Sequence, residues 1–151
     1  MKILLPVDGS DCSDVTLEWS ADTFDRQMTQ YYLIFVASII TDLPMVEFNL
    51  AEATRMLKRA QTKLEKQGCH VIEAEYVLGM PIEQICKYAV EQNMDLVVMG
   101  THGHSGLSKL LMGSISQGVL EHCKRPVLLF KKNSDYATPQ AEHHPMTHTI
   151  L

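Results

Sequence analysis

The sequence predicts an α/β fold, in which a five-stranded parallel sheet carries helices on both faces. Apolar strand-like runs and amphipathic helical stretches alternate along the chain in the order βαβαβαβαβ. Alternation of this kind is typical of parallel strands joined by right-handed helical crossovers. Four of the five runs are continuously apolar, as expected of strands buried on both faces. With 151 residues, 46% of them hydrophobic, the chain is long enough for one domain with a substantial core.

The predicted strands cover residues 3–7, 32–36, 71–77, 96–99 and 127–130. The third strand differs from the others because Glu73 and Glu75 alternate with Ile72, Ala74 and Tyr76. A period of two places alternate side chains on opposite faces, so this pattern predicts a half-exposed strand at an edge of the sheet.

Stripes of apolar residues at helical spacing predict a helix in each of the four connections. The first stripe comprises Leu17, Ala21, Phe24 and Met28, and the second runs from Leu50 to Leu64 with Gly68 as its C-terminal glycine. Pro81 is suited to the first position of the third helix. Ser114 is expected to begin the fourth helix, which includes Cys123 and stops at Pro126.

Composition excludes several classes of protein. The net charge is −5 and the basic residues are scattered, which argues against nucleic-acid binding. No apolar run approaches the roughly 20 residues that a membrane span needs, and the N-terminus is too short for a signal peptide, so a cytoplasmic location is expected. The four cysteines are far apart and form no C-x-x-C pair, which favours core thiols over a zinc site or a disulfide framework.

A long, glycine-rich connection follows the fourth predicted strand, with glycines at positions 100, 103, 106 and 113. Such connections usually take about 2 to 6 residues, and glycine lets a ligand approach the backbone closely. The first turn of the next helix offers unpaired N–H groups to phosphate, and Ser114 and Ser116 add hydroxyl donors. Alternatively, Ser114 caps the helix and Gln117 completes a capping box, and the two roles are compatible.

The glycine loop fits none of three common signatures. It lacks the G-x-x-x-x-G-K-[ST] of a P-loop, and it follows the fourth strand rather than the first, as a dinucleotide fingerprint would. It also lacks the nucleophile elbow, because Leu107 stands where the last glycine is needed. His102, His104 and Lys109 are expected mainly to be solvated loop residues.

The glycines and Ser114 fit the spacing G-x2-G-x9-G-[ST], and in this respect the chain resembles the ATP-binding branch of the universal stress protein family. Residues 5–10, 81–85, 95–100 and 125–128 resemble further landmarks of that family. The resemblance covers residues 1–131. We therefore expect one nucleotide-binding domain over residues 1–132 and a polar C-terminal tail over residues 133–151.

The resemblance implies a Rossmann-like fold, similar to that of adenine nucleotide α hydrolases, with strand order 3-2-1-4-5. Open α/β sheets bind ligands where the strand order reverses, here between the first and fourth strands. The implied ligand is ATP, or ADP or AMP, with Mg²⁺ bound to the phosphates. The residues implied to contact the nucleotide are Pro6, Val7, Asp8, Val36, Met99, Gly100, Thr101, Gly103, Gly113, Ser114, Ile115 and Ser116.

Two of these positions have alternatives. Asp8 is implied to be the main polar contact to adenosine, but an Asp before Gly-Ser also makes turns and caps helices. The backbone of Val36 is implied to meet the adenine, and the bulky Phe35 beside it departs from the residues usual in the family.

Three functions remain open at this point. The first is a nucleotide-binding regulator in stress response that acts on a protein partner which the sequence does not identify. The second is an enzyme, such as a slow ATPase or a phosphoryl or nucleotidyl transferase, although no catalytic residue is evident. The third is a dimeric scaffold that binds no nucleotide. The apolar fifth strand would lie at a sheet edge, which predicts a homodimer through that strand.

Overall fold

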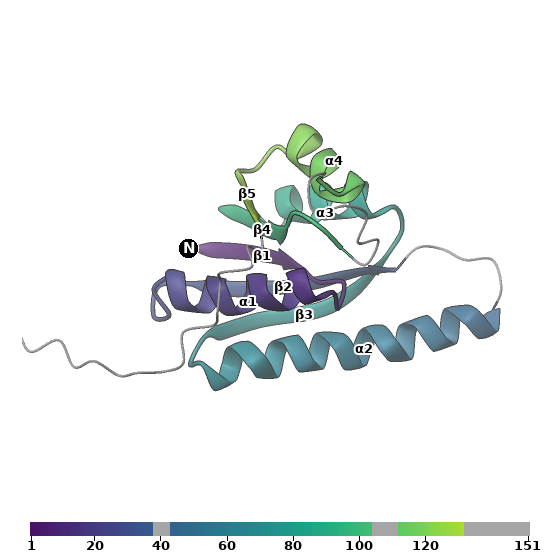
Figure 1. Cartoon of the computed structure of the whole chain (residues 1–151), viewed down its shortest axis with the longest axis horizontal. Coiled ribbons are helices and arrows are strands. Elements are labelled where there is room, and N and C mark those ends of the chain that lie inside the picture. Colours follow the sequence, from purple (N-terminus) through teal and green to yellow (C-terminus); the bar gives the residue numbers. More distant parts are fainter. Residues whose placement is uncertain (38–42, 104–111, 132–151) are drawn as a thin grey trace, which may run out of the picture.

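The computed structural model describes residues 1–37, 43–103 and 112–131, with the side chains of residues 43–49 left aside. All five strands form one parallel sheet in the order β3-β2-β1-β4-β5, as predicted (Figure 1). The elements in chain order are β1 (Lys2–Pro6), α1 (Asp11–Thr23), β2 (Gln30–Ala37), α2 (Leu43–Lys66), β3 (His70–Leu78), α3 (Pro81–Glu91), β4 (Leu96–Gly100), α4 (Ser114–His122) and β5 (Val127–Phe130).

The helices cover both faces of the sheet, α1 and α2 on one face and α3 and α4 on the other (Figure 1). Successive residues of β1 point in opposite directions, so that Leu5 packs with Leu17 of α1 while Leu4 packs with Ile85 of α3. Both sides of the strand are therefore buried, which explains the continuous apolar runs in the sequence.

The edge position of β3 is confirmed. Each of its residues is partly buried or exposed and none is fully buried, and only β2 pairs with it in the described part of the chain. The pairing shifts by one residue between Tyr31 and Tyr32 of β2, which marks a bulge in the ladder. On the face of α3, the hydroxyl of Tyr88 donates a hydrogen bond of 2.9 Å to Glu73.

The end of α2 follows the predicted glycine signal. Gly68 has a φ of +80°, a conformation that only glycine adopts at little cost. Its N–H donates to the carbonyl of Glu65, and the N–H of Cys69 donates to that of Leu64. These two bonds are the Schellman arrangement, which satisfies the last carbonyls of the helix and turns the chain into β3.

The predicted extents of two helices were wrong. Helix α1 ends at Thr23 with Phe24 as its C-cap, and Met28 lies outside the helix with 70% of its surface exposed. An Asp25 carboxylate oxygen accepts the N–H groups of Gln27 and Met28, and this local turn competes with further helix. In α4, Cys123 is the C-cap rather than a residue within the helix.

The predicted C-terminal tail, residues 133–151, lies outside the described residues, as do Gly106, His104 and Lys109 of the glycine loop. None of the helices among the described residues combines the length and the apolar character that crossing a bilayer requires.

Candidate functional site

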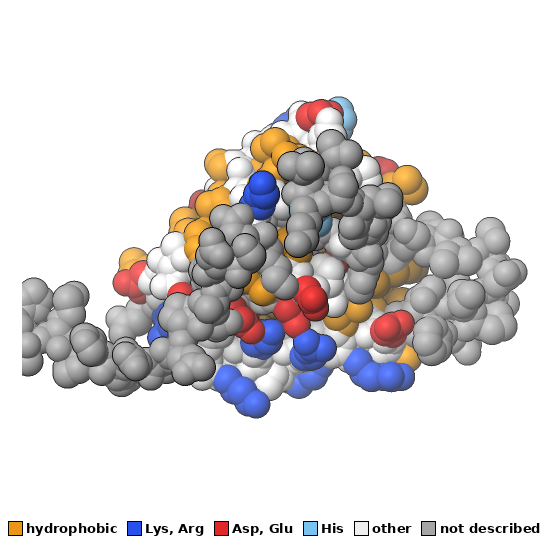
Figure 2. All heavy atoms as spheres, in the orientation of Figure 1, with side chains coloured by type: hydrophobic (Ala, Val, Ile, Leu, Met, Phe, Trp, Pro, Cys, Tyr) orange, Lys and Arg blue, Asp and Glu red, His pale blue; other side chains and the backbone are white. Residues whose placement is uncertain are grey.

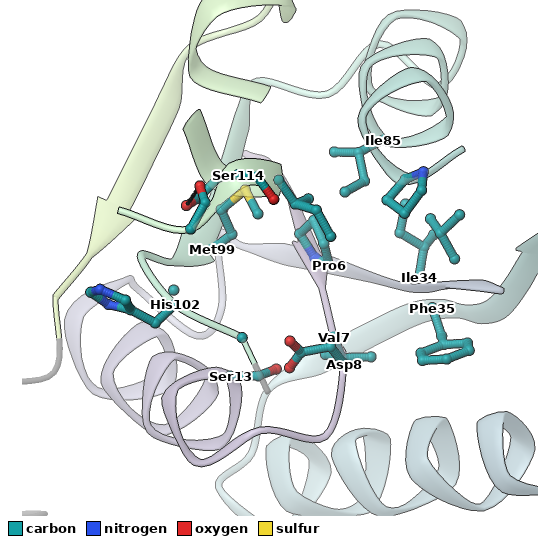
Figure 3. A pocket seen from close by; sticks show the side chains of 17 residues that line it. Pro6, Val7, Asp8, Ser13, Ile34, Phe35, Ile85, Met99, His102 and Ser114 are labelled. Atoms are coloured by element: carbon teal, nitrogen blue, oxygen red, sulfur yellow. Dashed lines mark hydrogen bonds between the residues drawn. The ribbon is translucent and has the colours of Figure 1, made fainter. Parts of the chain in front are cut away.

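A cavity of about 330 Å³ lies beyond the carboxyl ends of β1 and β4 (Figure 3). From this point β1 leads into α1 on one face, whereas β4 leads toward α4 on the other. The strand order therefore reverses here, and a crevice at such a reversal is where open α/β sheets bind ligands. The volume falls within the range of small-molecule sites.

Eleven of the twelve residues expected to contact a nucleotide line this one cavity. They come from four separate segments of the chain, which the fold brings together: Pro6, Val7, Asp8, Val36, Met99, Gly100, Gly103, Gly113, Ser114, Ile115 and Ser116.

Asp8 faces the glycine loop and also organises the turn after β1. One carboxylate oxygen accepts the N–H of Ser10 at 2.9 Å, and the Ser10 hydroxyl in turn accepts the N–H of Ser13 at 3.2 Å as the N-cap of α1. The other oxygen lies so close to Gly103 that a Cβ there would be 2.4 Å from it. The turn role of Asp8 is thus observed, and its contact with a nucleotide remains a prediction.

Gly100 is required by a second close approach. A Cβ at this position would lie 2.6 Å from the sulfur of Cys12, in the first turn of α1. The thiol itself lies 3.9 Å from the carbonyl oxygen of Phe130 in β5. Glycines at 100 and 103 therefore let the backbone after β4 pass directly beside α1 and Asp8.

Helix α4 begins at Ser114, as predicted, but the alternative role of Ser114 as the cap was wrong. Gly113, not Ser114, is its N-cap, and Gln117 donates to Glu121 at 3.0 Å instead of completing a capping box. Among the described residues no side chain caps this helix. Its first amides, those of Ser114, Ile115 and Ser116, have no acceptor within the helix and lie at the cavity.

The two ends of the glycine loop are tied together at Thr101. The Thr101 carbonyl oxygen accepts the N–H of Gly113 at 2.8 Å and lies 2.9 Å from the hydroxyl of Ser116. The same hydroxyl is 2.9 Å from the Gly113 carbonyl oxygen. Thr101 is the one expected site residue that does not line the cavity; the structure places it behind the wall, where it holds the start of α4 in position.

The sequence model of the universal stress protein family matches residues 1–131 of the chain. The chain belongs to that family. Universal stress protein MJ0531 of Methanocaldococcus jannaschii is 32% identical over 87% of this chain and 82% of its own length. YxiE of Bacillus subtilis is 27% identical over 86% of this chain and 98% of its own length.

Solved structures of the family share the fold. The structure of MJ0577 is 27% identical, with a TM-score of 0.75, over 87% of this chain and 96% of that protein. A universal stress protein from Arabidopsis thaliana, At3g01520, was solved with AMP bound; it is 20% identical, with a TM-score of 0.68, over 89% of this chain and 94% of its own. The family and fold predicted from the sequence are thus confirmed, and the similarity to MJ0577 supports its ATP-binding branch.

Sequence reasoning missed some residues of the cavity in this universal stress protein. Pro81 and Ile85 of α3 line it, together with Ser13 of α1 and Ile34 of β2. The two α3 residues could have been predicted. In a parallel sheet β3 ends at the same edge as β1 and β4, and α3 therefore starts at that edge. Phe35, expected only to affect the fit of an adenine, also contributes to the wall.

His102 is not the solvated loop residue that was expected. It lines the cavity and is half-buried, and its Nδ1 lies 2.9 Å from the Thr101 hydroxyl. Its Nε2 is buried and has no hydrogen-bond partner among the described residues.

The charges around the cavity are few. Asp8 is the one acidic residue among the lining residues described, and none of them is Lys or Arg. Residues 1–37, 43–103 and 112–131 contain no cluster of three metal-ligating side chains. The described lining residues can therefore offer an anion backbone amides and hydroxyls, and they can offer a cation the Asp8 carboxylate, the hydroxyl oxygens and the His102 imidazole.

Proposed function

We propose that this universal stress protein binds an adenine nucleotide, ATP foremost, in the cavity between β1 and β4. The observation that carries the proposal is the first turn of α4, which no described side chain caps and which lies with Asp8, Gly100 and Gly103 around one cavity. Free amides at a helix N-terminus favour phosphate. The AMP-bound Arabidopsis protein shares the fold, so a nucleotide at this position is compatible with the architecture.

In the proposed complex, the adenine lies against Pro6, Val7 and the backbone of Val36, and Asp8 accepts hydrogen bonds from the adenosine. Met99, Gly100 and Gly103 follow the ribose and the first phosphate, and Thr101 supports them from behind. The distal phosphates meet the amides of residues 114–116 and the hydroxyl of Ser114, while Gly113 and the Ser116 hydroxyl hold the start of the helix through the Thr101 carbonyl. A Cβ at Gly103 would lie 2.4 Å from Oδ2 of Asp8, so glycine at this position leaves the carboxylate in place beside the proposed path.

Mg²⁺ is proposed to enter with the phosphates, since it is usually held by one or two oxygen ligands of the protein together with phosphate and water. The side-chain oxygen ligands among the described cavity residues are the Asp8 carboxylate and the hydroxyls of Ser13, Ser114 and Ser116. Bound in this way, the ion would neutralise phosphate charge that no lysine or arginine of the described wall meets.

The role proposed for the bound nucleotide is regulatory, in a cytoplasmic stress response, through a protein partner. Phosphoryl transfer needs positioned cations and an oriented nucleophile, and the described lining residues provide neither a Lys nor an Arg. Slow ATP hydrolysis is the alternative, and phosphate release by the wild type and by Asp8→Ala decides it. Turnover that exceeds the background hydrolysis and is lost in the variant would contradict a purely regulatory role.

Residues 1–132 are proposed to act as one domain that forms a homodimer through β5. This strand is the last of the sheet, and within the described residues nothing pairs with its outer edge. An apolar strand edge is suited to pair with a second copy. Sedimentation equilibrium is expected to give a dimer, and a monomer at micromolar concentration would contradict this part of the proposal.

Isothermal titration with ATP, ADP and AMP, with and without Mg²⁺, tests nucleotide binding, and two substitutions of one residue locate the site. Gly113→Asp puts a carboxylate at the N-cap of α4, where it accepts from the amides meant for phosphate. It is expected to stabilise the helix and to abolish binding. Gly113→Ala is the matched control, because it adds the same Cβ, 3.3 Å from the Thr101 carbonyl oxygen, without charge.

The outcomes separate binding from folding. A ligand at 100 times its Kd stabilises the wild type by about 2.7 kcal/mol, which thermal unfolding detects readily. The proposal fails if none of the three nucleotides at millimolar concentration stabilises the wild type. It also fails at this site if Gly113→Asp binds as tightly as Gly113→Ala.

A further inference from the structure

Two cysteines that are distant in the sequence come together on the face of the sheet covered by α3 and α4. Cys86 lies in α3, and Cys123 is the C-cap of α4. Both pack against the same hydrophobic cluster, both are partly exposed, and the pKa of Cys86 is raised in part by Cys123. The two thiols are therefore neighbours in the fold.

Close packing of the two helices brings the two thiols near each other. A Cβ at Gly118 of α4 would lie 2.3 Å from Cδ1 of Ile82 in α3, so the helices approach as closely as a glycine allows. Cys86 follows Ile82 by four positions, which places both on the same face of α3. The other two thiols lie elsewhere, Cys12 in α1 and Cys69 in the cluster under α1 and α2.

We propose that Cys86 and Cys123 form a reversible disulfide, which a small-molecule disulfide such as glutathione disulfide installs and free thiols remove. The bond would tie the middle of α3 to the end of α4. It would close a loop that contains β4 and the glycine loop, residues 87–122. This inference is independent of nucleotide binding, although the two helices also contribute Ile85 and Ser116 to the cavity.

The reaction proceeds by two thiol–disulfide exchanges. The Cys123 thiolate attacks one sulfur of glutathione disulfide, which forms a mixed disulfide and releases glutathione thiolate. Cys86 then loses its proton and attacks the Cys123 sulfur, which releases the second glutathione. Two S–H bonds of the protein are replaced by one S–S bond, and both electrons and both protons leave with two molecules of glutathione.

The environment of the thiols assigns this order. Burial raises the pKa of Cys86 to about 11, and the charge and sulfur of Cys123 contribute to the shift. Cys86 is therefore the poorer first nucleophile, since the thiolate is the attacking species. Once Cys123 is in a mixed disulfide it carries no charge, so its contribution to the pKa of Cys86 disappears and the second exchange is favoured.

Wild-type protein incubated with glutathione disulfide, then alkylated and analysed by mass spectrometry, tests the proposal. We expect the protein to lose the mass of two hydrogen atoms and to yield one linked peptide pair containing Cys86 and Cys123. Thermal unfolding is expected to shift upward by about 10 °C, because the bond constrains the unfolded chain, and dithiothreitol should reverse the shift.

Three variants complete the test. Cys86→Ser is expected to accumulate glutathione on Cys123, whereas Cys123→Ser is expected to react little at Cys86. Cys12→Ala is the control and should form the linked peptide like the wild type. The proposal is overturned if wild-type protein stays unreacted or keeps glutathione as a stable adduct. Linkage of another cysteine pair, or of two molecules, would overturn it equally.

Discussion

Replacing Gly103 by alanine tests the contact that joins the end of β1 to the glycine loop. The new Cβ would lie 2.4 Å from Oδ2 of Asp8, which is closer than real Cβ contacts. The carboxylate is not free to swing away, because its other oxygen accepts the Ser10 N–H at 2.9 Å. We therefore expect Gly103→Ala to displace Asp8 and to break that hydrogen bond at the start of α1.

The magnitude follows from three contributions. The lost hydrogen bond costs about 0.5–1.5 kcal/mol, and an off-rotamer Asp8 side chain costs about 0.5–1.5 kcal/mol. Opposing them, alanine restricts the unfolded chain and stabilises by about 0.4–1 kcal/mol, since Gly103 is not among the residues with positive φ. The net loss of unfolding free energy is about 1 kcal/mol.

The substitution Asp8→Ala tests whether the clash with the Asp8 carboxylate causes this loss. In Asp8→Ala the carboxylate is absent, so Gly103→Ala meets no clash and is expected to stabilise by about 0.5 kcal/mol. The double-mutant cycle therefore predicts a coupling of about 1.5 kcal/mol between the two positions. No other described side chain is placed to produce this sign reversal, because only Asp8 lies within 4 Å of the added Cβ.

Urea unfolding of the four proteins measures the cycle, with the fluorescence of Trp19 and far-UV circular dichroism as probes. Trp19 is the single tryptophan and packs on Phe130 with ring centroids 5.2 Å apart. A matched control combines Gly103→Ala with Asp95→Ala, whose carboxylate accepts the Lys2 N–H at the opposite end of the sheet. Additivity within about 0.5 kcal/mol in the Asp8 cycle, or equal coupling in the control, would refute the reasoning.

Three further predictions concern the scaffold around the cavity. Gly118→Ala should lower the unfolding free energy by about 1–2 kcal/mol, because its Cβ overlaps with Ile82. In an Ile82→Ala background the same substitution should stabilise the protein through helix propensity. Denaturant unfolding of the protein with and without Gly118→Ala, in each background, checks this. Ser10→Ala removes the N-cap of α1 and should cost about 1 kcal/mol, with far-UV circular dichroism as the readout. Burial and the Glu73 charge raise the pKa of the Glu75 carboxyl. Stability is therefore lost as the pH rises from the unfolded pKa of 4.5 through the folded one. Glu75→Gln should thus raise Tm at pH 7, and the difference should vanish below about pH 4.

The fold was predictable because its signals are local and repeated. The continuous apolar runs of β1, β2 and β4 indicated strands with both sides buried, and the alternation around Glu73 indicated the half-exposed edge strand β3. The helix ends were less predictable where polar side chains form turns of their own. Asp25 forms a turn after α1 by accepting the N–H groups of Gln27 and Met28. The spacing of the apolar residues, which includes Met28, does not reveal that this turn replaces further helix.

The site was predictable in its location and less so in its details. Glycine spacing and strand order predicted that residues of β1 and β4 meet at one cavity. Spacing alone does not tell whether Gly113 or Ser114 is the cap of α4. That choice depends on Thr101, whose carbonyl oxygen holds the Gly113 N–H and sets the start of the helix. The proximity of Cys86 to Cys123 could not be predicted for a related reason. It arises from the packing of α3 on α4, and the spacing of the cysteines in the sequence does not indicate it.

A comparison of α1 with α4, two of the helices that begin at this edge of the sheet, shows how the start of α4 at the cavity differs from an ordinary helix start. Helix α1 begins with Ser10, whose hydroxyl already accepts an amide of the first turn. Helix α4 begins with Gly113, which has no side chain to do so, and the Ser116 hydroxyl points back to the Thr101 and Gly113 carbonyls instead. A serine at 113 would stabilise the helix only slightly more than glycine does, but it would occupy the amides that face the cavity. Glycine at the cap therefore gives up little stability and keeps the helix terminus available to an anion.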